Sequence, residues 1–97
     1  MSYVVIIRFE GVNEADYWSV NDILGIKRDG SGPWPAGIRA HTAGPTPDGW
    51  VVAERWDSKS SQEKWMGSTL GAALAKAGVP APVQVIDYDT VNEKMFG

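Results

Sequence analysis

The sequence predicts an α+β fold in which two helices cover one face of a single antiparallel sheet. Strand-like and helix-like segments alternate over the 97 residues in the order β-α-β-β-α-β. The strand-like segments are rich in β-branched and aromatic residues, and each helix-like segment starts at a capping residue and stops at a glycine. Two right-handed β-α-β crossovers joined by a hairpin give a four-stranded antiparallel sheet, which is the ferredoxin-like arrangement.

The first strand is expected at residues 3–9, because this run contains only one charged side chain. Alternate side chains of a strand point to opposite faces of the sheet. Here both alternating sets are apolar, so both faces of the strand are expected to be buried. The two sets are Val4 with Ile6, and Val5 with Ile7 and Phe9.

The first helix is expected to begin after Asn13, which can cap it, and to end near Gly25. Acidic residues follow the cap, where they suit the positive end of the helix dipole. Apolar and aromatic side chains recur at helical spacing and form one arc, which consists of Tyr17, Val20, Ile23 and Leu24. Trp18 lies off that arc.

Residues 25–37 contain four glycines and two prolines, a density that no regular element survives. Long loops in small domains are often functional. Trp34 stands between two prolines, which makes it a stiff aromatic group. It either folds over a cavity or covers the end of the core.

The second and third strands are expected at residues 38–43 and 50–56, with a glycine- and proline-rich connection at 44–49. Ser58 then caps a second helix, whose apolar stripe runs from Trp65 to Ala77. Two glycines, Gly67 and Gly71, weaken this helix and mark a possible break or close approach. The fourth strand is expected at residues 83–89.

Composition indicates one globular domain, 1–97, with 43% hydrophobic and 22% charged residues. The net charge of −3 argues against nucleic acid and anionic membrane partners. The absence of cysteine excludes disulfides, thiolate metal ligands and cysteine nucleophiles. No signal peptide or membrane span is recognised, so a cytoplasmic protein is expected.

The expected sheet would have one face covered by helices and one face bare. A chain of this size is poorly suited to leaving an apolar sheet face in water. We therefore expect a homodimer in which the bare faces of two sheets pack together.

The hairpin register decides which polar side chains share a face. If Ala43 pairs with Trp50, then Arg39 lies opposite Glu54, and His41 projects from the same face. A slip of one residue would place Arg39 opposite Arg55, a like-charge pair that is unfavourable. The first register is therefore favoured.

His41, Glu54 and Arg39 are the candidate catalytic residues. An imidazole beside a carboxylate can act as a general base near neutral pH, and an arginine can stabilise an enolate or phenolate. The alternative is structural: His41 bonds the backbone or Glu54, and Arg39 and Glu54 form an ion pair. The sequence leaves both interpretations open.

Aromatic residues are the second indication of a ligand, because tryptophans line pockets for flat apolar molecules. The candidates for substrate binding are Trp34, Trp50, Trp56, Tyr17 and Trp18. Tryptophans also fill cores, and Trp65 is assigned to the core on that ground. A lone histidine without cysteine makes a structural zinc site implausible. No cofactor is expected.

The chain resembles the dimeric α+β barrel superfamily, which includes antibiotic-biosynthesis-monooxygenase-like and stress-responsive barrel proteins. The resemblance rests on residues 41–45 (HTAGP), 48–58 (DGWVVAERWDS) and 80–85 (PAPVQV), and it is closest to small actinobacterial members of unassigned activity. It implies the ferredoxin-like fold, a sheet-to-sheet dimer and a pocket beside the sheet. No catalytic motif is shared by the whole superfamily.

Two functional hypotheses follow. The first is a cofactor-free oxygenase, or a proton-transfer enzyme such as an isomerase or cyclase, acting on a flat aromatic or polyketide-like substrate. The second is a non-catalytic barrel with a structural or ligand-binding role. A haem-binding protein is a minor alternative, for which His41 is the one conventional axial ligand.

Overall fold

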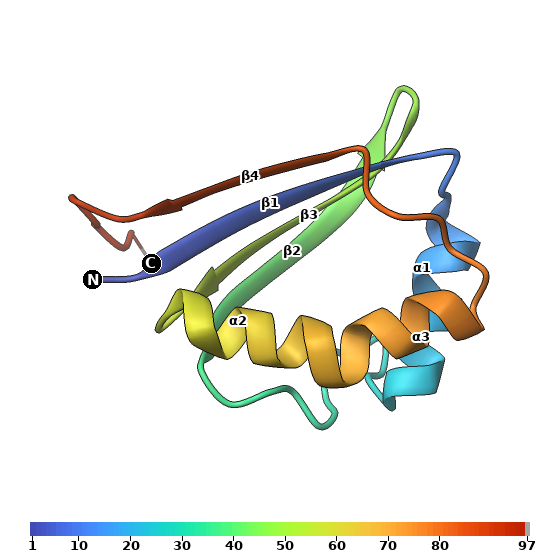
Figure 1. Cartoon of the computed structure of the whole chain (residues 1–97), viewed down its shortest axis with the longest axis horizontal. Coiled ribbons are helices and arrows are strands. Elements are labelled where there is room, and N and C mark those ends of the chain that lie inside the picture. The colour runs from blue at the N-terminus through green and yellow to red at the C-terminus, as the bar shows by residue number, and fades with distance from the viewer. Residues whose placement is uncertain (97) are drawn as a thin grey trace.

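The computed structural model describes residues 1–96 and has the predicted β-α-β-β-α-β order (Figure 1). The strands are β1 (Tyr3–Glu10), β2 (Ile38–Thr46), β3 (Gly49–Trp56) and β4 (Gln84–Asp89). The sheet order is β2-β3-β1-β4, and all three pairings are antiparallel. The ferredoxin-like α+β prediction is therefore confirmed.

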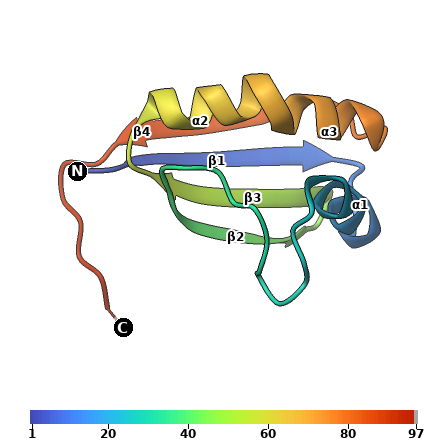
Figure 2. The same ribbon diagram turned by 90° about the horizontal axis from the view of Figure 1, so that it is seen from below.

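Two helical segments cover one face of the sheet. The first is α1 (Glu14–Leu24); the second runs without a turn through α2 (Lys59–Trp65), the π-helical η1 (Met66–Leu70) and α3 (Gly71–Lys76). Figures 1 and 2 show both segments on the same side of the sheet, with α1 lying across the end of the longer segment. No helix among residues 1–96 has the length and hydropathy needed to cross a membrane.

The core lies between the helices and the sheet. Alternate side chains of β1 are buried on this side and pack with two tryptophans of β3. The buried cluster consists of Tyr3, Val5, Ile7, Phe9, Val12, Trp50 and Trp56. Trp56 is completely buried and Val5 is 1% exposed, so the centre of the core lies where β1 meets β3.

The opposite face of the sheet is covered by no helix or strand among residues 1–96 (Figure 1). Its apolar side chains are partly exposed and consist of Val4, Ile6, Val51, Ala53, Ile86 and Tyr88, and the polar side chains of Arg8, Arg55 and Gln84 lie on the same face. Ile86 is 48% exposed and Tyr88 is 52% exposed. Within one chain, β1 is therefore buried on one face only, and we call the uncovered side the open face.

Local signals explain the bounds of α1. Asn13 Oδ1 accepts a hydrogen bond from the Asp16 backbone N–H, and the Asp16 carboxylate accepts one from the Asn13 N–H, which completes a capping box. Gly25 ends the helix in the left-handed conformation, with φ of 79°. The predicted arc needs one correction, because Asn21 is buried and Ile23 is 40% exposed.

The β2–β3 hairpin is tighter than predicted. Strand β2 continues to Thr46, so only Pro47 and Asp48 form the turn instead of residues 44–49. The register also differs from the prediction, because Trp50 pairs with Pro45 and not with Ala43. A difference of two residues keeps the side chains from Ala40 to Thr46 on their predicted faces. Ile38 is the exception, because the irregularity between Ile38 and Ala40 places it opposite Trp56, where it packs against the core.

The glycines of the second helical segment do not break it. The chain passes instead through the π-helical turn Met66–Leu70. A Cβ atom on Gly71 would lie 2.8 Å from the Met66 carbonyl oxygen, so this glycine allows the backbone to widen. Such π-turns are frequent beside functional sites.

Among the glycines of the sheet, Gly49 has the least space for a side chain. A Cβ atom there would overlap the backbone carbonyl oxygen of Phe9 on β1, which cannot move without shifting the strand. We expect Gly49→Ala to lower the free energy of unfolding by about 1–3 kcal/mol, measured by chemical denaturation. Gly44→Ala is the control, because open space surrounds that position and the change should be within about 1 kcal/mol of neutral. Equal stabilities of the two variants would contradict this account of the β1–β3 contact.

Candidate functional site

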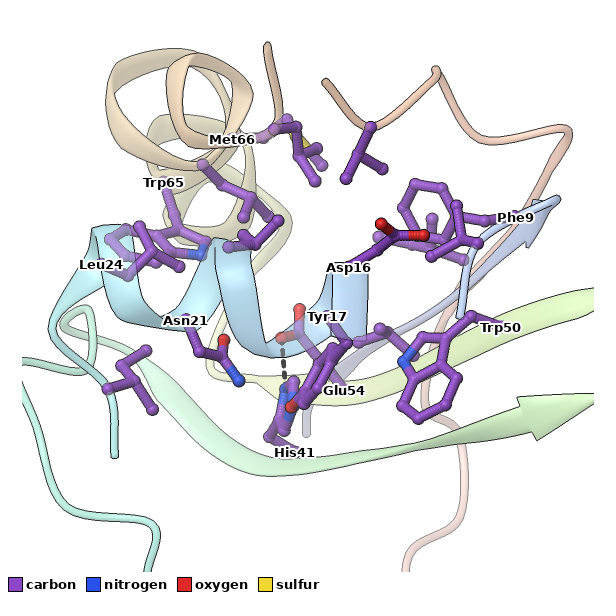
Figure 3. Close-up of a pocket in the computed structure, with 18 of the residues that line it drawn as sticks. Phe9, Asp16, Tyr17, Asn21, Leu24, His41, Trp50, Glu54, Trp65 and Met66 are labelled. Carbon is purple, nitrogen blue, oxygen red and sulfur yellow. Dashed lines mark hydrogen bonds and ion pairs between the residues drawn. The ribbon is translucent and has the colours of Figure 1, made fainter. Parts of the chain in front are cut away.

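A cavity of about 70 Å³ lies between the helix-covered face of the sheet, α1, the second helical segment and the 25–37 loop (Figure 3). Most of its lining is apolar. The polar lining residues are Asp16, Tyr17, Asn21, His41 and Glu54. An apolar cavity of about 150 Å³ holds one benzene molecule. A ligand the size of a ring therefore requires part of the wall to move.

Three of the polar residues form a hydrogen-bonded chain. The His41 Nδ1 atom lies 2.8 Å from Glu54 Oε2, and the His41 Nε2 atom lies 2.6 Å from the Tyr17 hydroxyl. The three side chains come from β2, β3 and α1 respectively. Figure 3 shows the three side chains close together beside β2 and β3, with the His41–Glu54 contact drawn as a dashed line. The sequence placed His41 and Glu54 on one face, and that prediction is confirmed.

Glu54 holds this chain in place. It is 6% exposed, and its second oxygen, Oε1, accepts a hydrogen bond of 3.2 Å from the Trp56 indole N–H. A buried carboxylate is tolerated only when its oxygens are hydrogen-bonded. Both oxygens are satisfied here, and the bond from His41 fixes the orientation of the imidazole.

The protonation of the chain follows from its partners. A carboxylate only accepts hydrogen bonds, so the His41 Nδ1 atom carries the proton that it donates to Glu54. In a neutral ring, Nε2 is then the acceptor for the Tyr17 hydroxyl. Burial raises the pKa of Tyr17, the Asn21 side chain lowers it, and the Glu54 charge raises it further. The net effect is upward, so the hydroxyl keeps its proton at neutral pH and can donate to His41.

Arg39 does not belong to this site, and its predicted position opposite Glu54 is wrong. The partner of Glu54 is His41, because the register differs by two residues and β2 has an irregularity between Ile38 and Ala40. The Arg39 guanidinium instead donates a hydrogen bond of 2.8 Å to the Ser2 hydroxyl. Among residues 1–96, no Lys or Arg side chain lines the cavity.

The aromatic candidates divide into two groups. Trp34 and Trp50 line the cavity with Tyr17. The Trp34 ring centroid is 5.0 Å from that of His41, and its indole N–H donates to the Gly30 carbonyl, which holds the loop over the histidine. Trp56 and Trp18 are outside the lining. Trp56 supports Glu54 from within the core, and Trp18 bonds to Glu14 at the surface.

Sequence reasoning missed Asn21 as a site residue. Asn21 is four residues after Tyr17 on α1, so both side chains fall on the same helix face. A polar residue on an otherwise apolar arc was the signal that could have revealed it. Trp65, which was assigned to the core, packs against the core and also lines the cavity.

The site offers no ready place for a metal or haem iron. Residues 1–96 contain no group of three His, Cys, Asp or Glu side chains arranged to hold a metal ion. Both ring nitrogens of His41 are engaged by protein partners, and a cavity of about 70 Å³ does not accommodate a porphyrin. The residues present therefore do not fit an axial haem site.

The fold is shared with several solved structures of low sequence identity. A candidate antibiotic biosynthesis monooxygenase from Chloroflexus aurantiacus is 16% identical over 100% of both chains, with a TM-score of 0.64. Rv0793 from Mycobacterium tuberculosis is 21% identical over 98% of this chain and 100% of its own, with a TM-score of 0.68. A DABB family protein with a ferredoxin-like fold from Mesorhizobium loti is 8% identical over 96% of this chain and 97% of its own, with a TM-score of 0.53.

The sequence matches no protein-family profile and no curated protein. The structural likeness extends over nearly the whole chain and agrees with the superfamily resemblance of the sequence. At these identities it establishes the fold that the chain shares with these proteins.

The Tyr17 hydroxyl is expected to stabilise the folded state through its bond to His41. Replacing Tyr17 by Phe leaves His41 Nε2 without this partner and should lower the free energy of unfolding by about 1 kcal/mol at pH 7. Tyr88→Phe, on the open face, is the control and should have no effect.

The same variant should change the response to alkali. Because burial raises the pKa of Tyr17, the folded chain keeps a proton above pH ~10 that the unfolded chain loses. Stability therefore falls as the pH rises above that value, and Tyr17→Phe should lessen the fall. The pKa of Tyr3 is also raised, by burial and then by its bond to Asp87, so some of the fall should remain. An identical alkaline profile for wild type and Tyr17→Phe would contradict the assignment.

Proposed function

We propose that the protein binds a flat small molecule in this cavity and catalyses a proton transfer from it without a cofactor. The observation that carries the proposal is the Tyr17–His41–Glu54 chain in the wall of a mostly apolar cavity. General bases are recognised by this arrangement, in which a third group orients the base toward the proton it accepts.

The residues have distinct roles in the proposed step. The substrate approaches the Tyr17 oxygen, which accepts a proton from an acidic C–H or O–H group as its own proton passes to His41 Nε2. The products are a substrate anion and a His41 imidazolium, whose charge the Glu54 carboxylate stabilises at Nδ1. Tyr17 never carries a full charge in this relay, which is consistent with the burial that raises its pKa.

The substrate anion formed in this step has two possible fates. Reprotonation at another atom would make the protein an isomerase, or attack of the anion on a carbonyl carbon of the same molecule a cyclase, whereas reaction with molecular oxygen would make it a cofactor-free oxygenase. The structural neighbours described as candidate antibiotic biosynthesis monooxygenases favour the second fate. Oxygen consumption, measured with an oxygen electrode, separates the two.

The test uses 2-tetralone, a flat uncharged ketone with acidic C–H groups. Exchange of its α-hydrogens in D₂O at pH 7, followed by NMR, should be accelerated by the wild-type protein. His41→Gln should lose about 10²–10⁴-fold of the protein-catalysed rate, because the general base is removed. Tyr17→Phe should lose a similar factor, and Tyr88→Phe should lose none.

The alternative function is a non-catalytic barrel with a structural or ligand-binding role, and the small volume of the cavity favours it. Binding of 2-tetralone without any acceleration of exchange, or an equal rate in His41→Gln, would support this alternative and exclude His41 as a base. Far-ultraviolet circular dichroism of each variant ensures that a lost rate does not reflect lost folding.

We further propose that two chains pair through the open faces of their sheets. The supporting observation is the apolar character of that face, where Val4, Ile6 and Ile86 lie on neighbouring strands. Contiguous apolar surface of this kind marks interaction sites in soluble proteins.

Sedimentation velocity at micromolar concentration should show a dimer, and Ile6→Glu should shift it to a monomer. Burying two unpaired carboxylates at such an interface is strongly unfavourable. Ala72→Glu, on the exposed side of the second helical segment, is the control and should remain dimeric. A stable wild-type monomer would refute the proposed dimer.

A further inference from the structure

Two buried N–H groups of the cavity have no hydrogen-bond partner. Among the buried side-chain polar atoms of residues 1–96, they are the only ones so placed: Nδ2 of Asn21 and Nε1 of Trp50. Asn21 is 5% exposed, Trp50 is 6% exposed, and both line the cavity. Buried donors in native proteins are nearly always paired, so two unpaired donors in one cavity require an explanation.

The two donors lie on either side of Tyr17. Asn21 comes from α1 and Trp50 from β3, and Figure 3 shows the Tyr17 ring between them. The Tyr17 and Trp50 ring centroids are 5.2 Å apart. Asn21 is close enough to Tyr17 to lower its pKa, although its Nδ2 atom makes no hydrogen bond of normal geometry. The Asn21 amide and the Trp50 indole can therefore each donate to an acceptor atom of a ligand that lies beside Tyr17, whose own proton is donated to His41.

The charge of the wall limits the ligand further. Asp16 and Glu54 line the cavity, and the lining contains no Lys or Arg. A carboxylate, sulfate or phosphate ester would enter a mostly apolar site beside two acids, where no Lys or Arg balances its charge and His41 is already paired with Glu54, which is unfavourable. The unpaired donors require acceptor atoms on the ligand. The negative charges of Asp16 and Glu54 require that the ligand carry no formal negative charge.

We infer that Asn21 and Trp50 are the ligand-recognition residues of the cavity, and that they select an uncharged flat ring with two oxygen acceptors, such as a quinone or a ring diketone. This inference deepens the proposed function, because it concerns the ligand of the same cavity. It does not depend on His41 acting as a base.

The binding test compares three probes that share one ring system: 1,4-naphthoquinone, naphthalene and 2-naphthoate. The chain has no cysteine, so the quinone forms no thiol adducts. We expect the quinone to bind about threefold to tenfold more tightly than naphthalene, or more, because it gains one or two net hydrogen bonds. The 2-naphthoate anion should bind more weakly than the quinone.

The indole N–H signals of the five tryptophans in a ¹H–¹⁵N spectrum provide a direct readout. The Trp50 signal is identified as the one that is missing from the spectrum of the Trp50→Phe variant. This signal should move downfield when the quinone is added and should not move downfield when naphthalene is added. A downfield shift is the mark of a newly formed hydrogen bond.

Substitution separates recognition from structure. Asn21→Leu should reduce quinone affinity about threefold to tenfold and leave naphthalene affinity unchanged. Its melting temperature should be equal to or above that of the wild type, because the variant removes an unpaired buried donor. Asp22→Leu, at the neighbouring exposed position outside the cavity lining, is the control and should bind both probes as the wild type does.

Several outcomes would overturn the inference: equal affinities for quinone and naphthalene, unchanged selectivity in Asn21→Leu, or tighter binding of 2-naphthoate. A marked loss of stability in Asn21→Leu would show that Asn21 is structural. Failure of the proposed function gives a different result, in which quinone selectivity persists while His41-dependent exchange of 2-tetralone is absent.

Discussion

The site depends on one constraint, the burial of the Glu54 carboxylate beneath the helices. A carboxylate in such a place must have hydrogen bonds to both oxygens, and only His41 and Trp56 provide them. Satisfying Glu54 therefore fixes the imidazole on β2 and the indole on β3. It also leaves the second nitrogen of His41 facing α1, where Tyr17 meets it. One buried charge thus connects the core to the proposed relay.

Stability and recognition conflict within the same cavity. The core side of β1 is filled by tightly packed apolar groups, with Val5 and Trp56 almost wholly buried. In the wall of the cavity, Asn21 and Trp50 each bury a donor without a partner, which costs roughly 1–3 kcal/mol apiece. Sites for ligands commonly carry such local penalties, because polar groups must be ready before the ligand arrives.

The walls of the cavity differ in how firmly they are held. The sheet wall is fixed by β1–β3 pairing and by the hydrogen bonds of Glu54. The opposite walls include the Trp34 loop, where the Trp34 indole is held by one hydrogen bond to the Gly30 carbonyl, and the π-helical turn Met66–Leu70. Enlargement for a ring-sized ligand is therefore expected on the loop and helix side. A rigid polar floor with adjustable apolar walls suits a site that must orient a flat molecule.

Sequence alone predicted the order of elements and the helix caps at Asn13 and Ser58, because these depend on local spacing. It also predicted that His41 and Glu54 share a face, because side chains of a strand alternate with a period of two residues. The pairing itself could not be predicted, since registers that differ by two residues give identical faces and only the tight turn at 47–48 selects between them. For that reason the prediction matched Glu54 with Arg39 instead of His41. Likewise, the contact of Tyr17 with His41 and the unpaired state of Asn21 depend on how α1 packs across the sheet, which is decided by tertiary structure.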